Sequence, residues 1–122
     1  MADLPRNYCP ILLNWTTNCC WPVASNKWEP LEYVMYKPRW GAYYDTNLDR
    51  HLRETSSDTV VFAGCNFLSC PRASIYQASE RDFRIALVSD AISGLYARGI
   101  GECRVIGVEV LGLSETQDWL TC

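Results

Sequence analysis

The chain has 122 residues, of which 48% are hydrophobic, and its formal net charge is −3 at pH 7. This length predicts one small domain, and the mild charge and ordinary hydrophobicity exclude a disordered protein and a basic nucleic-acid-binding surface. No apolar run is long enough to span a bilayer, so we expect no membrane partner, and the mild negative charge predicts no nucleic-acid partner.

The seven cysteines are spread along the chain, and the single histidine is His51. An odd number of cysteines cannot all pair in intramolecular disulfides, and none has the C-x-x-C spacing of many metal sites. We therefore expect a cytoplasmic protein with free thiols, no metal and no cofactor.

The hydrophobic pattern divides the chain near Glu29. Residues 1–28 show no steady period, and we assign them to a divergent N-terminal segment with a short strand at Ile11–Leu13. Residues 29–122 are regular and are predicted to form the domain itself.

The first elements of this domain are a strand over Tyr33–Tyr36 and a helix over Thr46–Glu54. Thr46 is a suitable cap for the helix, and Leu48 and Leu52 share one face of it.

From residue 59 onward, strands alternate with helices. Thr59–Ala63 is an apolar, β-rich run closed by Gly64, which is typical of a buried parallel strand. This alternation predicts a three-layer α/β/α fold with a mostly parallel sheet. The later elements are a helix over Pro71–Arg81, a strand over Arg84–Val88, a helix over 97–104, a strand over Gly107–Leu111, and a helix that Ser114 caps and that ends at Leu120.

Cys70 lies between the buried strand and the helix that begins at Pro71. At a helix N-terminus, unpaired backbone N–H groups and the positive end of the helix dipole stabilise a thiolate. Sites in open α/β sheets form at the carboxyl ends of strands, as here. A cysteine at a helix start is often only a small buried residue, so nucleophile and structural residue are both open interpretations. Cys65, Cys103 and Cys122 have no such setting and are expected to be structural.

Lys37 ends the Tyr33–Tyr36 strand, so it also lies at the carboxyl edge of the predicted sheet. A lysine close to a cysteine favours the thiolate electrostatically. The alternative is a solvated surface charge, which is also our interpretation of Arg39 and Arg72.

Together these segments resemble the isochorismatase-like cysteine hydrolase family, which includes nicotinamidases and N-carbamoylsarcosine amidases. The resemblance covers about residues 29–120 and implies a Rossmann-like fold that is incomplete at the N-terminus. It rests on Lys37 at a strand end, Ala42-Tyr43, Thr46-Asn47-Leu48, the turn from Gly64 to Cys70, and Val88-Ser89-Asp90-Ala91.

The resemblance implies that Cys70 is a nucleophile, acting on a small amide or related C–N or ester substrate, and that Lys37 lowers the energy of its thiolate. It also implies an oxyanion hole formed by the N–H groups of Asn66 and Cys70, and a non-proline cis peptide at Cys65–Asn66. The family has a small or branched residue after its cysteine, whereas this chain has Pro71, which has no N–H to donate.

The resemblance further implies a small-molecule substrate and a homo-oligomer. Trp40, Tyr43 and Phe67 could line an apolar pocket, or they could belong to the core or to an interface.

The family's catalytic triad also needs an aspartate at the end of the first strand, which takes the thiol proton and gives it to the leaving group. Residues 1–28 contain a single acidic residue, Asp3, which precedes any predicted strand. The nearest match to the first strand places Asn14 at this position, and an amide cannot take the proton. Asp45 and Asp90 are poor substitutes by analogy.

Either the family's first strands are absent or replaced, or the N-terminal segment is unrelated sequence joined to a family C-terminal half. We therefore predict an impaired cysteine hydrolase, with a non-catalytic binding or assembly module as the alternative. A small cysteine-rich binding domain outside the family fits the α/β pattern less well.

Overall fold

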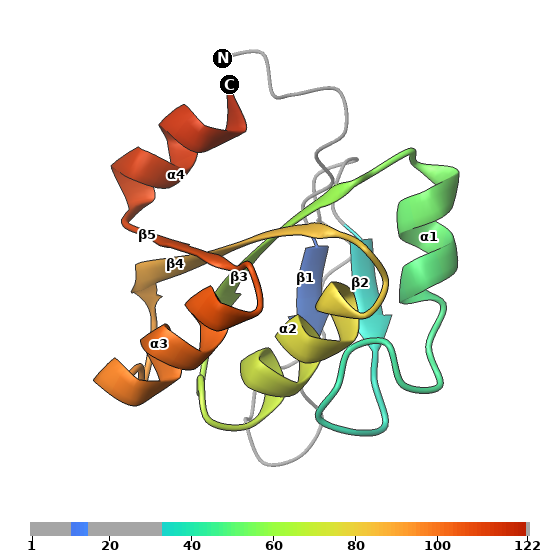
Figure 1. Cartoon of the computed structure of the whole chain (residues 1–122). Helices are drawn as coiled ribbons and strands as arrows, with labels where there is room; N and C mark the ends of the chain where they lie inside the picture. The colour runs from blue at the N-terminus through green and yellow to red at the C-terminus, as the bar shows by residue number, and fades with distance from the viewer. Residues whose placement is uncertain (1–10, 15–32, 122) are drawn as a thin grey trace.

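The computed structural model describes residues 11–14 and 33–121, with the side chains of Met35 and of residues 37–121. Apart from β1, the predicted N-terminal segment lies outside these residues, as do Asp3 and Cys122. The elements (Figure 1) are β1 (Ile11–Asn14), β2 (Tyr33–Tyr36), α1 (Leu48–Glu54), β3 (Thr59–Gly64), α2 (Cys70–Ser79), β4 (Arg84–Ile92), α3 (Ala97–Val105), β5 (Glu109–Leu111) and α4 (Leu113–Leu120).

All strand pairs within the described residues are parallel. β1 pairs with β2, and a second sheet has the order β3-β4-β5. The register places Asn14, the last residue of β1, opposite Tyr36, which directly precedes Lys37. The loops that follow β2 and β3 both lie at the lower end of the molecule in Figure 1.

Both faces of the β3-β4-β5 sheet are covered. Successive side chains of a strand point to opposite faces, and Ile85, Ala86, Leu87 and Val88 of β4 are all buried. Ile85 and Leu87 belong to the main hydrophobic core, and α2 and α3 lie in front of the sheet in Figure 1. Helix α4 also contacts β4. The predicted α/β fold with a parallel sheet is confirmed.

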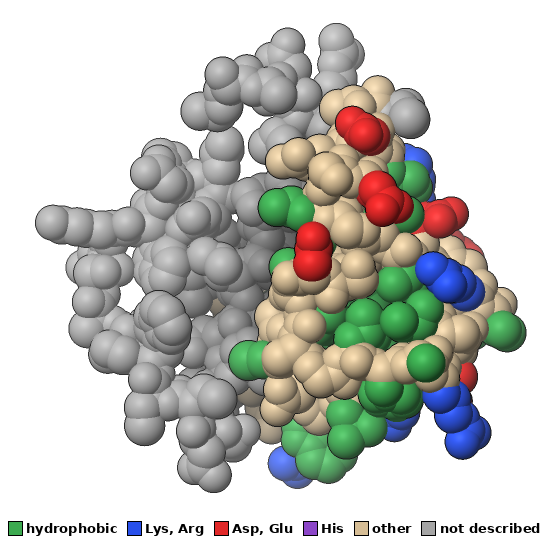
Figure 2. Space-filling view, turned by 90° about the vertical axis from the view of Figure 1, so that its left-hand side faces the viewer, with side chains coloured by type: hydrophobic (Ala, Val, Ile, Leu, Met, Phe, Trp, Pro, Cys, Tyr) green, Lys and Arg blue, Asp and Glu red, His purple; other side chains and the backbone are tan. Residues whose placement is uncertain are grey.

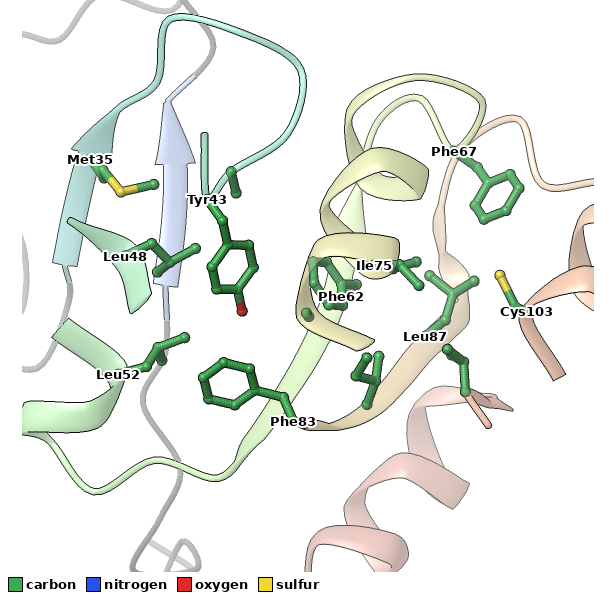
Figure 3. Close-up of a cluster of buried hydrophobic side chains, with 14 residues drawn as sticks. Met35, Tyr43, Leu48, Leu52, Phe62, Phe67, Ile75, Phe83, Leu87 and Cys103 are labelled. Carbon is green, nitrogen blue, oxygen red and sulfur yellow. The ribbon is translucent and has the colours of Figure 1, made fainter. Parts of the chain in front are cut away.

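The main core lies between the helices and the sheet (Figure 3). Phe67, Ile75 and Leu87 are completely buried, and Leu52 of α1 is 1% exposed. Burying one leucine-sized side chain stabilises the folded state by roughly 1.5–3 kcal/mol, so these core residues contribute strongly to the free energy of folding.

β4 runs four residues further than the sequence predicts, to Ile92 rather than Val88. The reason is a shift of register at the end of β3, after which Gly64 pairs with Ile92. The N–H of Ser93 then donates to the carbonyl of Gly64 at 2.9 Å. Gly64 has φ +117°, a conformation that a glycine adopts without steric cost.

Three helix starts differ in detail from the prediction. Helix α2 begins at Cys70, one residue before Pro71. Asn47 precedes α1 at the N-cap position, but the Thr46 hydroxyl accepts the N–H of Leu48 at 3.3 Å. Ser114 is not a cap, because α4 already begins at Leu113.

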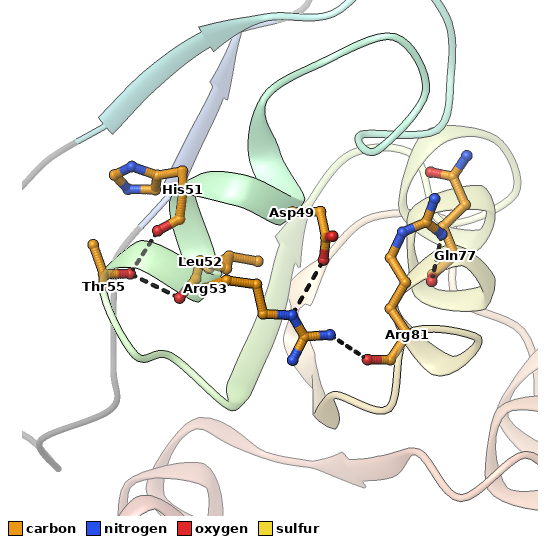
Figure 4. Close-up of polar contacts among 7 residues, drawn as sticks. All are labelled: Asp49, His51, Leu52, Arg53, Thr55, Gln77 and Arg81. Carbon is orange, nitrogen blue, oxygen red and sulfur yellow. Dashed lines mark hydrogen bonds and ion pairs between the residues drawn. The ribbon is translucent and has the colours of Figure 1, made fainter.

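A polar cluster joins α1 to the end of α2 (Figure 4). The Arg53 guanidinium pairs with Asp49 at 3.5 Å, donates to the carbonyl of Arg81 at 2.6 Å and stacks 4.2 Å from the centre of the Phe83 ring. Arg53 of α1 thus binds residues of the loop between α2 and β4 and links α1 to that loop.

Figure 2 shows the face of the molecule that lies on the left in Figure 1, where apolar side chains gather in the centre with carboxylates above them. Val105 is 87% exposed and Leu113 is 55% exposed.

No helix within residues 33–121 is long and apolar enough to cross a bilayer.

Candidate active site

Cys70 is the first residue of α2 and follows the loop that leaves β3. Its thiol is free and only 7% exposed. Among the described residues, no hydrogen bond uses the N–H of Cys70 or of Asn66. Within the described part of the chain, these two backbone donors, one in the turn before Cys70 and one on Cys70 itself, have no acceptor.

The loop before Cys70 is held by the segment that follows β4. The N–H of Phe67 donates to the carbonyl of Ser93 at 2.9 Å, and the Ser93 hydroxyl donates to Oδ1 of Asn66 at 2.6 Å. The Cys65–Asn66 peptide bond, for which the resemblance implies a cis conformation, is cis. These contacts fix the backbone on which the two unpaired N–H groups lie.

Lys37 is buried although it is charged, with 6% of its surface exposed. Its ammonium donates to the carbonyl of Arg39 at 2.8 Å and to that of Trp40 at 3.2 Å. The chain after β2 thus folds back on the lysine. We call residues 37–43 the Lys37 loop.

Two side chains of α2 bind the backbone of the Lys37 loop. The Ser74 hydroxyl accepts the N–H of Ala42 at 2.9 Å, and Oε1 of Gln77 accepts the N–H of Tyr43 at 3.0 Å. Residues four apart share one face of a helix, so Ser74 lies one turn after Cys70 on the same side. The face of α2 that carries Cys70 is therefore the one that meets the Lys37 loop.

The three aromatic residues predicted near the site do not share one location. Trp40 is 68% exposed, Tyr43 is 6% exposed and Phe67 is fully buried. Tyr43 contacts the ring of Phe83, with centroids 6.0 Å apart, whereas Phe67 packs edge-on against Tyr96. Tyr43 and Phe67 lie on opposite sides of α2 in Figure 3, both within the core.

Burial alters the ionisation of two side chains near these elements. Desolvation raises the pKa of Tyr43 despite the nearby positive charge of Arg81. Burial also raises the pKa of the Cys103 thiol, with a smaller contribution from Glu102. Both groups are therefore neutral at pH 7, and Cys103 has the character of a structural cysteine.

The other cysteine and the two arginines considered in the sequence analysis do not belong to a metal-binding group among the described residues. Cys65 is exposed, Arg39 is exposed, and Arg72 donates to the hydroxyl of Tyr96 at 3.1 Å. Among the described residues, no group of three or more histidine, cysteine or carboxylate side chains is placed to hold a metal ion.

Sequence reasoning missed Ser74 and Gln77. The one available signal was the spacing of Ser74, a polar residue four positions after Cys70 on the buried stripe of the helix. Its partner, the N–H of Ala42, lies 32 residues away in the sequence, and no local pattern indicates such a contact.

The isochorismatase domain profile matches residues 20–101 of this chain. Ureidoacrylate amidohydrolase of Methylobacterium radiotolerans is 33% identical over 63 residues, which are 52% of this chain and 24% of that protein. The chain therefore spans about a quarter of this curated relative.

Solved structures give the same result. N-carbamoylsarcosine amidase of Thermoplasma acidophilum is 32% identical with a TM-score of 0.62, and the match covers 69% of this chain and 50% of that one. An isochorismatase family protein of Desulfovibrio vulgaris is 27% identical with a TM-score of 0.72, and the match covers 82% of this chain and 55% of that one. With its parallel α/β fold and the profile match over most of its length, the chain belongs to the isochorismatase family.

Proposed function

We propose that this chain is a cysteine hydrolase that acts on a small amide or related C–N or ester substrate, with Cys70 as its nucleophile. The observation that carries the proposal is the place of Cys70 at the first turn of α2, where its own N–H and that of Asn66 have no acceptor among the described residues. The substrate class is supported by two relatives whose names describe amide hydrolysis.

In the proposed reaction the Cys70 thiolate attacks the carbonyl carbon of the substrate, and a C–S bond forms. The carbonyl oxygen becomes an oxyanion, which the N–H groups of Asn66 and Cys70 hold by hydrogen bonds. The oxyanion then collapses and the C–N or C–O bond breaks, so that the nitrogen departs as an amine after it is protonated, or the oxygen departs as an alkoxide or phenolate, and a thioester remains on Cys70. Water hydrolyses the thioester, releases a carboxylic acid and returns the thiol.

Lys37 is proposed to stabilise the thiolate by its positive charge. The support for this role is that the Lys37 loop is hydrogen-bonded to the face of α2 that carries Cys70. A positive charge a few ångströms from a thiolate lowers its energy, and the effect is stronger where both groups are buried.

The family's general acid is an aspartate at the end of the first strand, and the nearest match in this sequence has Asn14 there. The backbone of Asn14 ends β1 next to the end of β2, at the edge where the family's aspartate is expected. An amine leaves only after it gains a proton, whereas a nitrophenolate leaves without one. We therefore expect fast turnover of activated esters and slow turnover of amides.

The test compares p-nitrophenyl acetate with a simple amide in the wild-type chain, in Cys70→Ala and in Cys65→Ala. Ester hydrolysis should disappear in Cys70→Ala and persist in Cys65→Ala, which removes an exposed cysteine five residues away. Equal ester hydrolysis in wild type and Cys70→Ala would contradict the proposed nucleophile.

The second candidate is a non-catalytic member of the family that acts as a binding or assembly module. Asn14 at the carboxyl end of β1 favours it, because the loss of a general acid or base typically costs about 10² to 10⁴ in rate. This candidate predicts neither ester hydrolysis nor a covalent adduct on Cys70.

A further inference from the structure

Two side chains of α2, Ser74 and Gln77, hold the Lys37 loop against the helix that begins at Cys70. Both accept hydrogen bonds from the backbone of the loop. Ser74 is 1% exposed, so its bond to the N–H of Ala42 is shielded from water. Gln77 is half-buried and binds the next N–H, that of Tyr43. Consecutive backbone donors of the loop are thus both held from the same helix.

The other end of the loop is tied to the lysine itself. The Lys37 ammonium donates to the carbonyls of Arg39 and Trp40, which lie only two and three residues further on. The buried ammonium therefore has a fixed position within the loop, and Ser74 and Gln77 fix the loop on α2.

Gly41 makes this close approach possible. A Cβ atom on residue 41 would overlap the side-chain amide of Gln77. The loop backbone and the Gln77 amide are thus packed with no room between them, so small movements of the loop are resisted by contact as well as by hydrogen bonds.

We infer that Ser74 and Gln77 are positioning residues that keep the Lys37 ammonium in place relative to the Cys70 thiol. The inference rests on the proposed function, in which Lys37 supports the Cys70 thiolate. Its physical reason is that the attraction between two charges falls with distance and with access of water. If the loop detached from α2, the lysine would gain solvent and Cys70 would lose most of that support.

A purely structural role for Gln77 is the competing explanation, and a double-mutant cycle separates the two. Gln77→Leu removes the acceptor, and Gln77→Glu is the matched control because it keeps an acceptor oxygen at the same place. Each is made in the wild-type chain and in Lys37→Met. Gln77 is preferable to Ser74 because it is less buried and its replacement disturbs the fold less.

The measured quantity is the rate at which iodoacetamide modifies Cys70 at pH 7, read by peptide mass spectrometry with exposed Cys65 as the internal reference. In the wild-type chain Gln77→Leu should slow Cys70 about tenfold, the low end of the effect of a nearby opposite charge. Gln77→Glu should restore the rate to within about twofold. In the Lys37→Met background Gln77→Leu should have no further effect.

The outcomes separate the inference from the proposed function. If Gln77→Leu slows Cys70 equally with and without Lys37, or does not slow it at all, the positioning role is overturned while the nucleophile stands. If wild-type Cys70 reacts no faster than Cys65, the proposed function fails and the positioning role fails with it.

Discussion

At the scale of single residues, the site depends on side chains whose partners are far away in the sequence. Lys37 and Cys70 could be proposed as site residues from the sequence because each follows a strand, and strand ends have a local pattern. Ser74 and Gln77 were not visible, because their partners are backbone groups of Ala42 and Tyr43, more than thirty residues earlier.

The effect of a side chain at residue 41 can be measured directly. Gly41→Ala should displace the Gln77 amide from the N–H of Tyr43, because the new Cβ overlaps that amide. We expect the free energy of unfolding to fall by about 0.5–1.5 kcal/mol, the net contribution of one partly exposed hydrogen bond. Chemical denaturation gives this value.

Gly101→Ala is the matched control for this substitution. Gly101 lies inside α3, and its Cβ would meet nothing within 4 Å. Alanine there should stabilise the chain by about 0.5–1 kcal/mol, since it is the better helix former. A Gly41→Ala variant as stable as Gly101→Ala would show that the loop tolerates a side chain.

The buried thiol of Cys103 predicts a dependence of stability on pH. Its pKa is raised by burial, so the folded state retains the thiol proton at a pH where the unfolded chain, whose thiols ionise near about 8.5, releases it. The stabilisation is complete below that pH and is lost as the pH rises above it. The free energy of unfolding should therefore fall over the interval above about pH 8.5, where the unfolded thiol ionises.

Replacement of the thiol isolates this contribution. Cys103→Ala should flatten the decline over this interval, while Cys65→Ala, at an exposed cysteine, should leave it unchanged. Tyr43 contributes only at higher pH, because an ordinary tyrosine ionises near about 10. If the free energy of unfolding fell equally with pH in wild type and in Cys103→Ala, the Cys103 thiol would not be the cause of the decline.

At the scale of elements, the sequence predicted the order of strands and helices in the described region, because hydrophobic period and turn residues are local signals. The end of β4 was missed, since Ile92 rejoins the sheet only through a shift of register beside Gly64. The start of α4 was also missed. Ser114 has the chemistry of a cap, but the first N–H of the helix is bound from another element.

Asp90, at the exposed end of β4, supplies the missing cap. Its Oδ1 accepts the N–H of Leu113, the first residue of α4, at 3.0 Å. Asp90→Ala should lower the free energy of unfolding by about 0.5–2 kcal/mol, the usual cost of losing a cap. Ser114→Ala should change it much less, and thermal unfolding of both variants gives the comparison. A larger loss of stability in Ser114→Ala than in Asp90→Ala would show that Ser114 is the cap.

At the scale of the whole molecule, the fold and the family are shared with amide-hydrolysing relatives, while the chain spans about half the length of the solved ones. Fold and ancestry could be predicted from sequence because several spaced motifs agreed. Activity could not, since the proposed reaction needs a general acid, and the sequence has Asn14 where the family's aspartate is expected. The predicted homo-oligomer stays a prediction.

A gain of function tests whether Asn14 occupies the position of the family's acid. Asn14→Asp should raise the rate of amide hydrolysis by about 10²-fold or more, as a restored general acid does, and change ester hydrolysis far less. Kinetics with matched amide and ester substrates reveal the difference. In Asn14→Asp combined with Cys70→Ala, both activities should be absent. Equal amide rates in wild type and Asn14→Asp would place the acid elsewhere.

The central claim is that Cys70 is the nucleophile, and the intact mass of the chain after brief exposure to p-nitrophenyl acetate tests it most directly. We predict one added acetyl group, which peptide fragmentation assigns to Cys70 and which is lost as the thioester hydrolyses. An unmodified Cys70, or acetylation that is distributed equally over Cys65 and Cys70, would contradict the claim.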